Sequence, residues 1–92
     1  MSSLSFSQNG NLYESDVIQL TNNSVLELNF ESLSASGVSI WIMQSLTQEG
    51  WQGCYSDTLR QGTTWCKTLA GVSESAYYKV VCTAEPKSAN YE

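Results

Sequence analysis

The chain has 92 residues, enough for one domain with a thin hydrophobic core. Charged residues make up only 14% and apolar residues 41%, while Ser, Thr, Asn and Gln are abundant, a composition typical of a small secreted or cell-surface β domain. The formal net charge of −5 and four scattered basic residues argue against nucleic acid and anionic membrane surfaces as partners.

The N-terminal residues 1–5 (MSSLS) have neither the basic region nor the apolar core of a signal peptide. We expect an extracellular or cell-surface protein whose signal peptide is absent from this chain; the alternative is a cytosolic protein. No apolar run approaches the roughly 18 residues of a spanning helix, so we expect no membrane insertion.

Alternating apolar and polar residues predict strands along most of the chain. Residues 25–33 alternate most clearly, with Leu26, Leu28 and Phe30 expected to face the core. The turn signals between strands include Asn9-Gly10 and the small residues 34–37. The predicted strands cover, in chain order, residues 4–7, 12–20, 25–33, 38–46, 51–56, 63–69 and 76–84.

The strand at 38–46 is apolar on both alternating faces. Val38, Ile40 and Ile42 form one face, and Trp41 and Met43 lie on the other. Such a strand is expected to be an interior strand of a sheet that is covered on both sides.

Seven or eight strands with turns between them predict an all-β fold, a single antiparallel β-sandwich of the immunoglobulin-like or jelly-roll-like type. A small barrel is the main alternative. We expect the sandwich to occupy residues 1–86, with Pro86 ending the last strand. The tail at residues 87–92 has nothing obvious to bury and is expected to fray.

Cys54 and Cys66 flank the loop at residues 57–62 symmetrically. A hairpin in that register places them opposite one another and predicts a disulfide, which would fit an oxidising compartment. Cys82 is then left over. We favour a buried free thiol for it; the alternative is a bridge to another cysteine of this chain or of a second chain.

Three stretches carry a resemblance to a known family: residues 25–30 (VLELNF), 39–42 (SIWI) and 76–81 (AYYKVV). In this arrangement the chain resembles small secreted bacterial β-sandwich modules of the pre-peptidase C-terminal type. The resemblance implies a sandwich fold and a binding role. The acidic residues usual in the middle strand and the Gly usual before the tyrosines are missing, so no family site residues are carried over.

Nothing in the sequence predicts an enzyme. The chain has no His, so acyl-transfer triads built on an imidazole base and His-based zinc sites are excluded. Two carboxylates could serve a glycoside hydrolase, either Glu27 with Glu31 or Glu14 with Asp16, but alternation places Glu27 and Glu31 on a solvated face. A calcium site could form if Glu14, Asp16, Asn22 and Asn23 cluster at one end of the sandwich, but no spaced acidic loop supports it. We expect no metal and no cofactor.

Aromatic residues are the best functional lead. In the hairpin register, Trp51, Tyr55 and Trp65 share one face. If this face is exposed, it could stack on sugar rings or anchor a protein partner; if it points inward, the rings fill the core. The predicted ligand-binding residues are Trp51, Tyr55, Trp65, Gln52, Asp57 and Arg60.

The sequence therefore predicts a small non-catalytic binding module with a glycan or protein ligand on the aromatic hairpin. The alternative is a secreted effector, antimicrobial or toxin-like, or a structural surface protein that assembles through its strand edges. The oligomeric state is not predicted.

Overall fold

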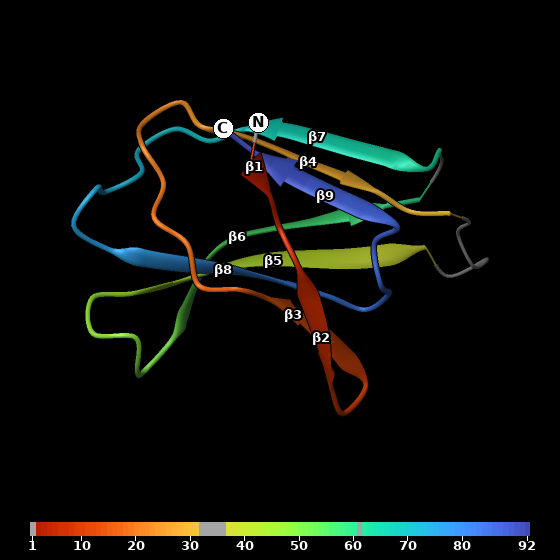
Figure 1. The fold of residues 1–92 in the computed structure, drawn as a ribbon, viewed down its shortest axis with the longest axis horizontal. Helices are drawn as coiled ribbons and strands as arrows, with labels where there is room; N and C mark the ends of the chain where they lie inside the picture. The colour runs from red at the N-terminus through yellow and green to blue at the C-terminus, as the bar shows by residue number, and fades with distance from the viewer. Residues whose placement is uncertain (1, 32–36, 61) are drawn as a thin grey trace.

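The computed structural model describes residues 2–31, 37–60 and 62–92, and this part of the chain is all-β (Figure 1). Two antiparallel sheets pack face to face, which confirms the predicted sandwich. One sheet has the order β1-β9-β4-β7, with β1 (Ser2–Ser3), β9 (Ser88–Tyr91), β4 (Val25–Asn29) and β7 (Thr64–Thr68). The other has the order β2-β3-β8-β5-β6, with β2 (Phe6–Asn9), β3 (Leu12–Ser15), β8 (Tyr77–Cys82), β5 (Val38–Ser45) and β6 (Gln52–Leu59).

The core lies between the two sheets and follows the predicted alternation. Leu26 and Leu28 of β4, with Phe30 just after it, are at most 1% exposed. From the other sheet Ile40 and Ile42 of β5 meet them. Burying each of these side chains contributes about 1.5–3 kcal/mol. The strand period of two thus sets the inner face of both sheets.

Residues 88–91 form β9, so the expectation of a frayed tail is wrong for them. The strand lies between β1 and β4 in the four-stranded sheet. Ala89 is 5% exposed and belongs to the core, and the Glu92 amide donates to the Val25 carbonyl. The strand was not predicted from the sequence, because Ser88, Ala89 and Asn90 are small or polar and give no clear alternation of apolar and polar residues.

The predicted hairpin of β6 with β7 is wrong. β6 pairs with β5, and β7 pairs with β4 in the opposite sheet. Consecutive strands that flank a short loop therefore cross from one layer to the other. At the start of β5, Gly37 (φ 76°) approaches β6 so closely that a Cβ would lie 2.6 Å from the Leu59 carbonyl oxygen.

β5 is an interior strand, between β8 and β6, as predicted. No strand of the described residues covers its second face, which corrects the expectation that both faces are buried. Trp41 and Met43 point away from the four-stranded sheet and are only half-buried. The rest of the predicted turn at residues 34–37, apart from Gly37, lies outside the described residues.

Deleting residues 87–92 is expected to destabilise the protein strongly, because it removes β9 and leaves β4 and β1 without a partner along one edge. We expect the free energy of unfolding in urea to fall by more than about 3 kcal/mol. Glu92→Gln, which keeps the strand, is the control. Unchanged stability of the truncated protein would contradict the assignment of β9.

Candidate binding face

The outer face of the five-stranded sheet carries an apolar groove, here called the outer groove. The strand pairing places Trp41 opposite Val81, Met43 opposite Lys79, and Glu14 opposite Val81, so these side chains share one face. The groove has a volume of about 440 Å³. It is lined by Leu12, Glu14, Trp41, Met43, Trp51, Lys79 and Val81.

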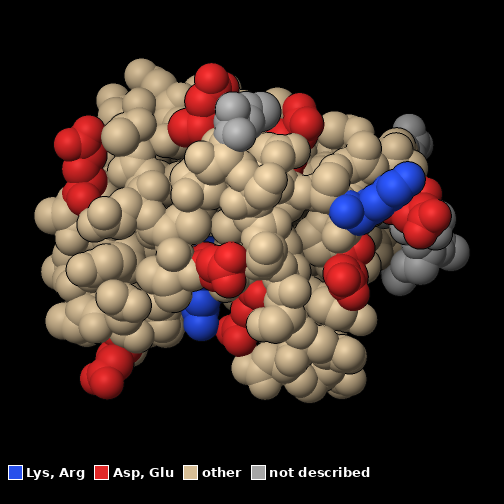
Figure 2. Space-filling model, in the orientation of Figure 1, with Lys and Arg blue, Asp and Glu red and all other residues tan. Residues whose placement is uncertain are grey.

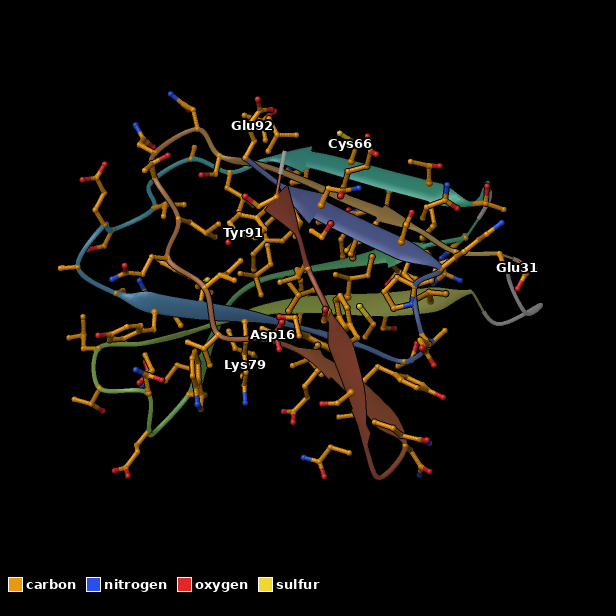
Figure 3. All side chains as sticks on the ribbon, viewed as in Figure 1. Asp16, Glu31, Cys66, Lys79, Tyr91 and Glu92 are labelled. Atoms are coloured by element: carbon orange, nitrogen blue, oxygen red, sulfur yellow. The ribbon has the colours of Figure 1, made fainter. Side chains whose placement is uncertain are left out.

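A chain of polar contacts crosses the groove from β2 to Trp51. Asn9 Nδ2 donates to Glu14 Oε2 (3.0 Å), and Lys79 Nζ donates to Glu14 Oε1 (3.1 Å). The same ammonium lies 4.7 Å from the centroid of the Trp51 ring, a cation–π contact. Figure 3 shows Lys79 on the side of β8 that faces away from β4, β7 and β9.

These contacts determine both the charge and the position of the groove's side chains. The hydrogen bond from Asn9 and then that from Lys79 hold the pKa of Glu14 below its usual value, so its carboxylate stays ionised. Trp51 lies just before β6, outside any strand, and the Lys79 ammonium holds its ring against the sheet. The tryptophan is therefore positioned by a side-chain contact.

The structure does not bring the six predicted ligand-binding residues together. Trp51 lines the outer groove, whereas Trp65 is 6% exposed and belongs to the core. Tyr55 faces inward from β6 and packs against that core. The predicted common aromatic face is therefore wrong, and the inward alternative holds for Trp65 and Tyr55. Gln52, Asp57 and Arg60 are exposed.

Tyr55, Asp57 and Trp65 instead close the side of the sandwich where β6 and β7 are both edge strands. The rings of Tyr55 and Trp65 lie 6.4 Å apart at an interplanar angle of 44°. Trp65 Nε1 donates to Asp57 Oδ2 at 2.8 Å, which joins the two sheets through side chains. The Lys67 ammonium lies 4.9 Å from the Tyr55 ring centroid.

The predicted disulfide is also wrong. All three cysteines are free, and Cys54 and Cys66 lie in opposite sheets. Cys82 is the buried free thiol that we favoured, fully buried on β8, where desolvation raises its pKa to about 12. The argument for an oxidising compartment that rested on a bridge is thereby removed.

Sequence reasoning missed the residues that make up most of the outer groove. The alternation predicted that the second apolar face of β5, with Trp41 and Met43, is buried. The groove is completed by Leu12 of β3 and Lys79 of β8, which the alternation did not connect with that face. The length of the chain was the feature that could have indicated an exposed face, because about 90 residues form two layers and leave the outer face of each sheet uncovered. In the described residues no three side chains of the metal-ligating types Asp, Glu, Cys and His cluster, and no helix is long and apolar enough to cross a bilayer.

None of the known family models, curated proteins and solved structures compared with the chain matches it. The resemblance to pre-peptidase C-terminal modules thus stays a prediction.

The two tryptophans of the predicted hairpin are expected to behave differently when truncated. Trp65→Ala should lower the free energy of unfolding by about 3–5 kcal/mol, because it opens a cavity between the sheets. Trp51→Ala should cost about 1 kcal/mol or less, because the ring is half-buried on the outer face. Urea denaturation of both variants measures the difference; equal losses would contradict the placement of the two rings.

Asp57 is expected to make stability depend on pH. The hydrogen bond from Trp65 and then that from the Thr58 amide lower its pKa in the folded protein. The stabilisation that the ionised Asp57 contributes is therefore complete at a pH above its unfolded-state pKa of about 3.9. It is lost as the pH falls through the lower pKa of the folded protein.

Asp57→Asn should thus be less stable than the wild type at pH 7, with a difference that shrinks below about pH 4. Thermal melts from pH 2.5 to 7 measure it. Glu49→Gln, an equal change of charge at an exposed loop residue whose side chain makes no hydrogen bond or ion pair with the described residues, controls for net charge. A stability difference between the wild type and Asp57→Asn that stayed constant from pH 2.5 to 7 would count against the hydrogen bond from Trp65 to Asp57.

Proposed function

We propose that the protein is a non-catalytic binding module whose outer groove binds a glycan. The observation that carries this proposal is the pair Trp41 and Trp51 on an outer sheet face that no other described element covers. A flat aromatic ring packs well against the apolar C–H face of a pyranose ring. The groove volume of about 440 Å³ is in the range of small-molecule sites.

Polar groups beside the two rings can bind sugar hydroxyls. The side chain of Glu14 is 28% exposed, and each of its carboxylate oxygens accepts one hydrogen bond from the described residues and can accept a second. Lys79 is already paired with this carboxylate, and the protein carries a net charge of −5. These charges favour a neutral glycan over a sulfated or sialylated one.

Hydrolysis of the glycan has less support than binding. Glycoside hydrolysis commonly requires two carboxyl groups on either side of the scissile bond. Glu14 is the one carboxylate among the described residues that line the groove. Figure 2 shows acidic side chains scattered over this view of the surface, with few basic ones among them.

Self-assembly through strand edges, the alternative function, has less support too. β6 is the long edge strand of its sheet, but it carries the charged Asp57, whose carboxylate bonds to Trp65 of the other sheet, and a bulge opposite Ile42 and Met43. Both features protect an edge from pairing with a second chain. A glycan ligand fits the extracellular or surface location that the composition predicts, and this location remains part of the proposal.

Trp41→Ala and Trp51→Ala are each expected to weaken glycan binding roughly tenfold or more while the fold stays intact. A glycan array identifies the ligand, and isothermal titration of the best binder measures the affinity. Far-ultraviolet circular dichroism checks the fold. Binding should also change the intrinsic fluorescence, since two of the three tryptophans lie in the groove.

Leu46→Ala is the matched control, because Leu46 is a 70% exposed apolar side chain outside the groove. It should leave glycan affinity unchanged. Glycans that bind both tryptophan variants as well as the wild type, or an array without any binder, would contradict the proposal.

A further inference from the structure

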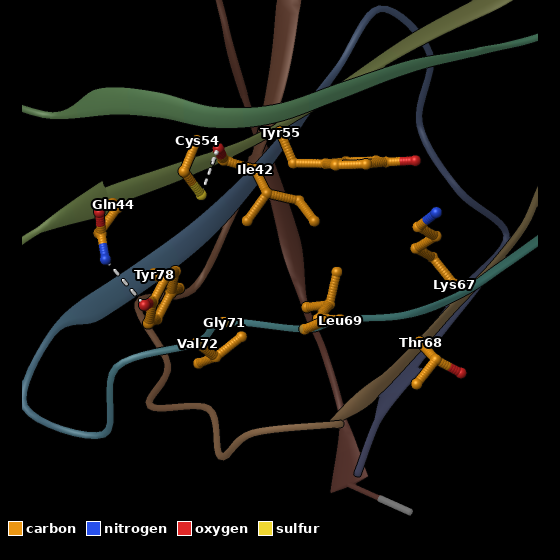
Figure 4. A pocket seen from close by; sticks show the side chains of 11 residues that line it. Ile42, Gln44, Cys54, Tyr55, Lys67, Thr68, Leu69, Gly71, Val72 and Tyr78 are labelled. Carbon is orange, nitrogen blue, oxygen red and sulfur yellow. Dashed lines mark hydrogen bonds between the residues drawn. The ribbon is translucent and has the colours of Figure 1, made fainter.

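A second cavity opens between the sheets, on the side where β6 and β7 are edge strands; we call it the side cleft. Its volume is about 360 Å³, and it is bounded by β5, β6, β7 and the segment that follows β7 (Figure 4). Ile42 and Leu69 form its apolar interior and are at most 6% exposed. The cleft belongs to the inner face of the five-stranded sheet, so it is separate from the outer groove.

A β-bulge shapes the wall of the side cleft. Ile42 pairs with Tyr55 and Met43 pairs with Gly53, so Cys54 is the extra residue on β6. Both Cys54 and Tyr55 line the cleft, although neighbouring residues of a regular strand face opposite sides. The bulge therefore directs a second side chain into the cavity.

Hydrogen-bonding groups lie at one end of the cleft. The hydroxyl of Tyr78, a residue 2% exposed, accepts from Gln44 Nε2 (2.8 Å) and from the Ser73 amide (2.9 Å). No acceptor for the hydroxyl's own hydrogen is found among the described residues. This hydrogen and Gln44 Oε1 are available to a ligand.

A positive charge lies at the other end. Figure 4 shows Lys67 across the cleft from Gln44 and Tyr78, with Ile42 and Leu69 between them. Among the described residues that line the cleft, Lys67 is the one with a formal charge at neutral pH, because burial raises the pKa of the Cys54 thiol and keeps it protonated. No carboxylate of the described residues lies within ion-pair distance of the Lys67 ammonium, and the charge of Asp57 acts on it only from farther away.

We propose that the side cleft binds a small organic carboxylate with an apolar body and a hydroxyl group at its far end. The carboxylate pairs with Lys67, the body packs on Ile42 and Leu69, and the hydroxyl bonds to Gln44 and Tyr78. In a protein with a net charge of −5, a cleft whose one charged residue is a lysine selects for an anion. This site does not depend on the outer groove.

The probe is 3-(4-hydroxyphenyl)propionate, which has an aryl body between a carboxylate and a hydroxyl. Its binding is read by alkylation of the cysteines with iodoacetamide, followed by mass spectrometry of the peptides. Both thiols are exposed, but Cys54 lines the cleft, whereas Cys66 lies on the other sheet outside it and serves as an internal control. We expect the probe to slow alkylation of Cys54 and to leave Cys66 unaffected.

Two analogues separate the contributions of the ends. The primary amide of the probe, which lacks the charge, should bind about tenfold more weakly to the wild type. Lys67→Met, which keeps the apolar stem of the lysine, should bind the amide and the carboxylate equally well. 3-Phenylpropionate, which lacks the hydroxyl, should lose a few fold in affinity for both proteins.

Three results would overturn the proposal: no protection of Cys54 at millimolar probe, equal protection of Cys66, or an unchanged preference for the carboxylate in Lys67→Met. Trp51→Ala should bind the probe like the wild type, since Trp51 lies in the outer groove. Loss of probe binding in that variant would also overturn it. If no glycan binds to the outer groove, the proposal for the side cleft still stands, because the two sites are tested separately.

Discussion

The number of layers is the constraint on which the rest of the structure depends. A chain of 92 residues forms two sheets here, and each sheet can cover one face of the other. β5 is apolar on both faces, so burying Val38, Ile40 and Ile42 between the sheets leaves Trp41 and Met43 on the outside. The outer groove follows from this geometry, because no third layer is available within the described residues.

Properties that depend on one strand at a time could be predicted from the sequence. The alternation of residues 25–30 correctly identified Leu26, Leu28 and Phe30 as core, since the strand period of two fixes which side chains share a face. The sandwich and the buried thiol of Cys82 followed from the same pattern. Each of these conclusions needs no knowledge of the neighbouring strand.

Strand pairing could not be predicted, because a short loop serves a hairpin and a crossing between sheets equally well. The interactions that accompany the crossing join residues of β6 and β7 across the layers, such as Asp57 to Trp65. No local pattern marks such a bond in advance. The disulfide and the shared aromatic face both depended on the hairpin register, and both were wrong for this one reason.

The bulge between β5 and β6 links the two candidate sites. On the outer face Met43, which lines the outer groove, lies opposite Gly53, and a Cβ at Gly53 would lie 3.8 Å from the methionine sulfur. On the inner face the extra residue Cys54 joins Tyr55 in the wall of the side cleft. A regular strand would place one residue in every two on each face. One inserted residue near the sheet edge therefore shapes the wall of the side cleft next to the strand position where Met43 lines the outer groove, and it also makes the edge of β6 a poor partner for a further strand.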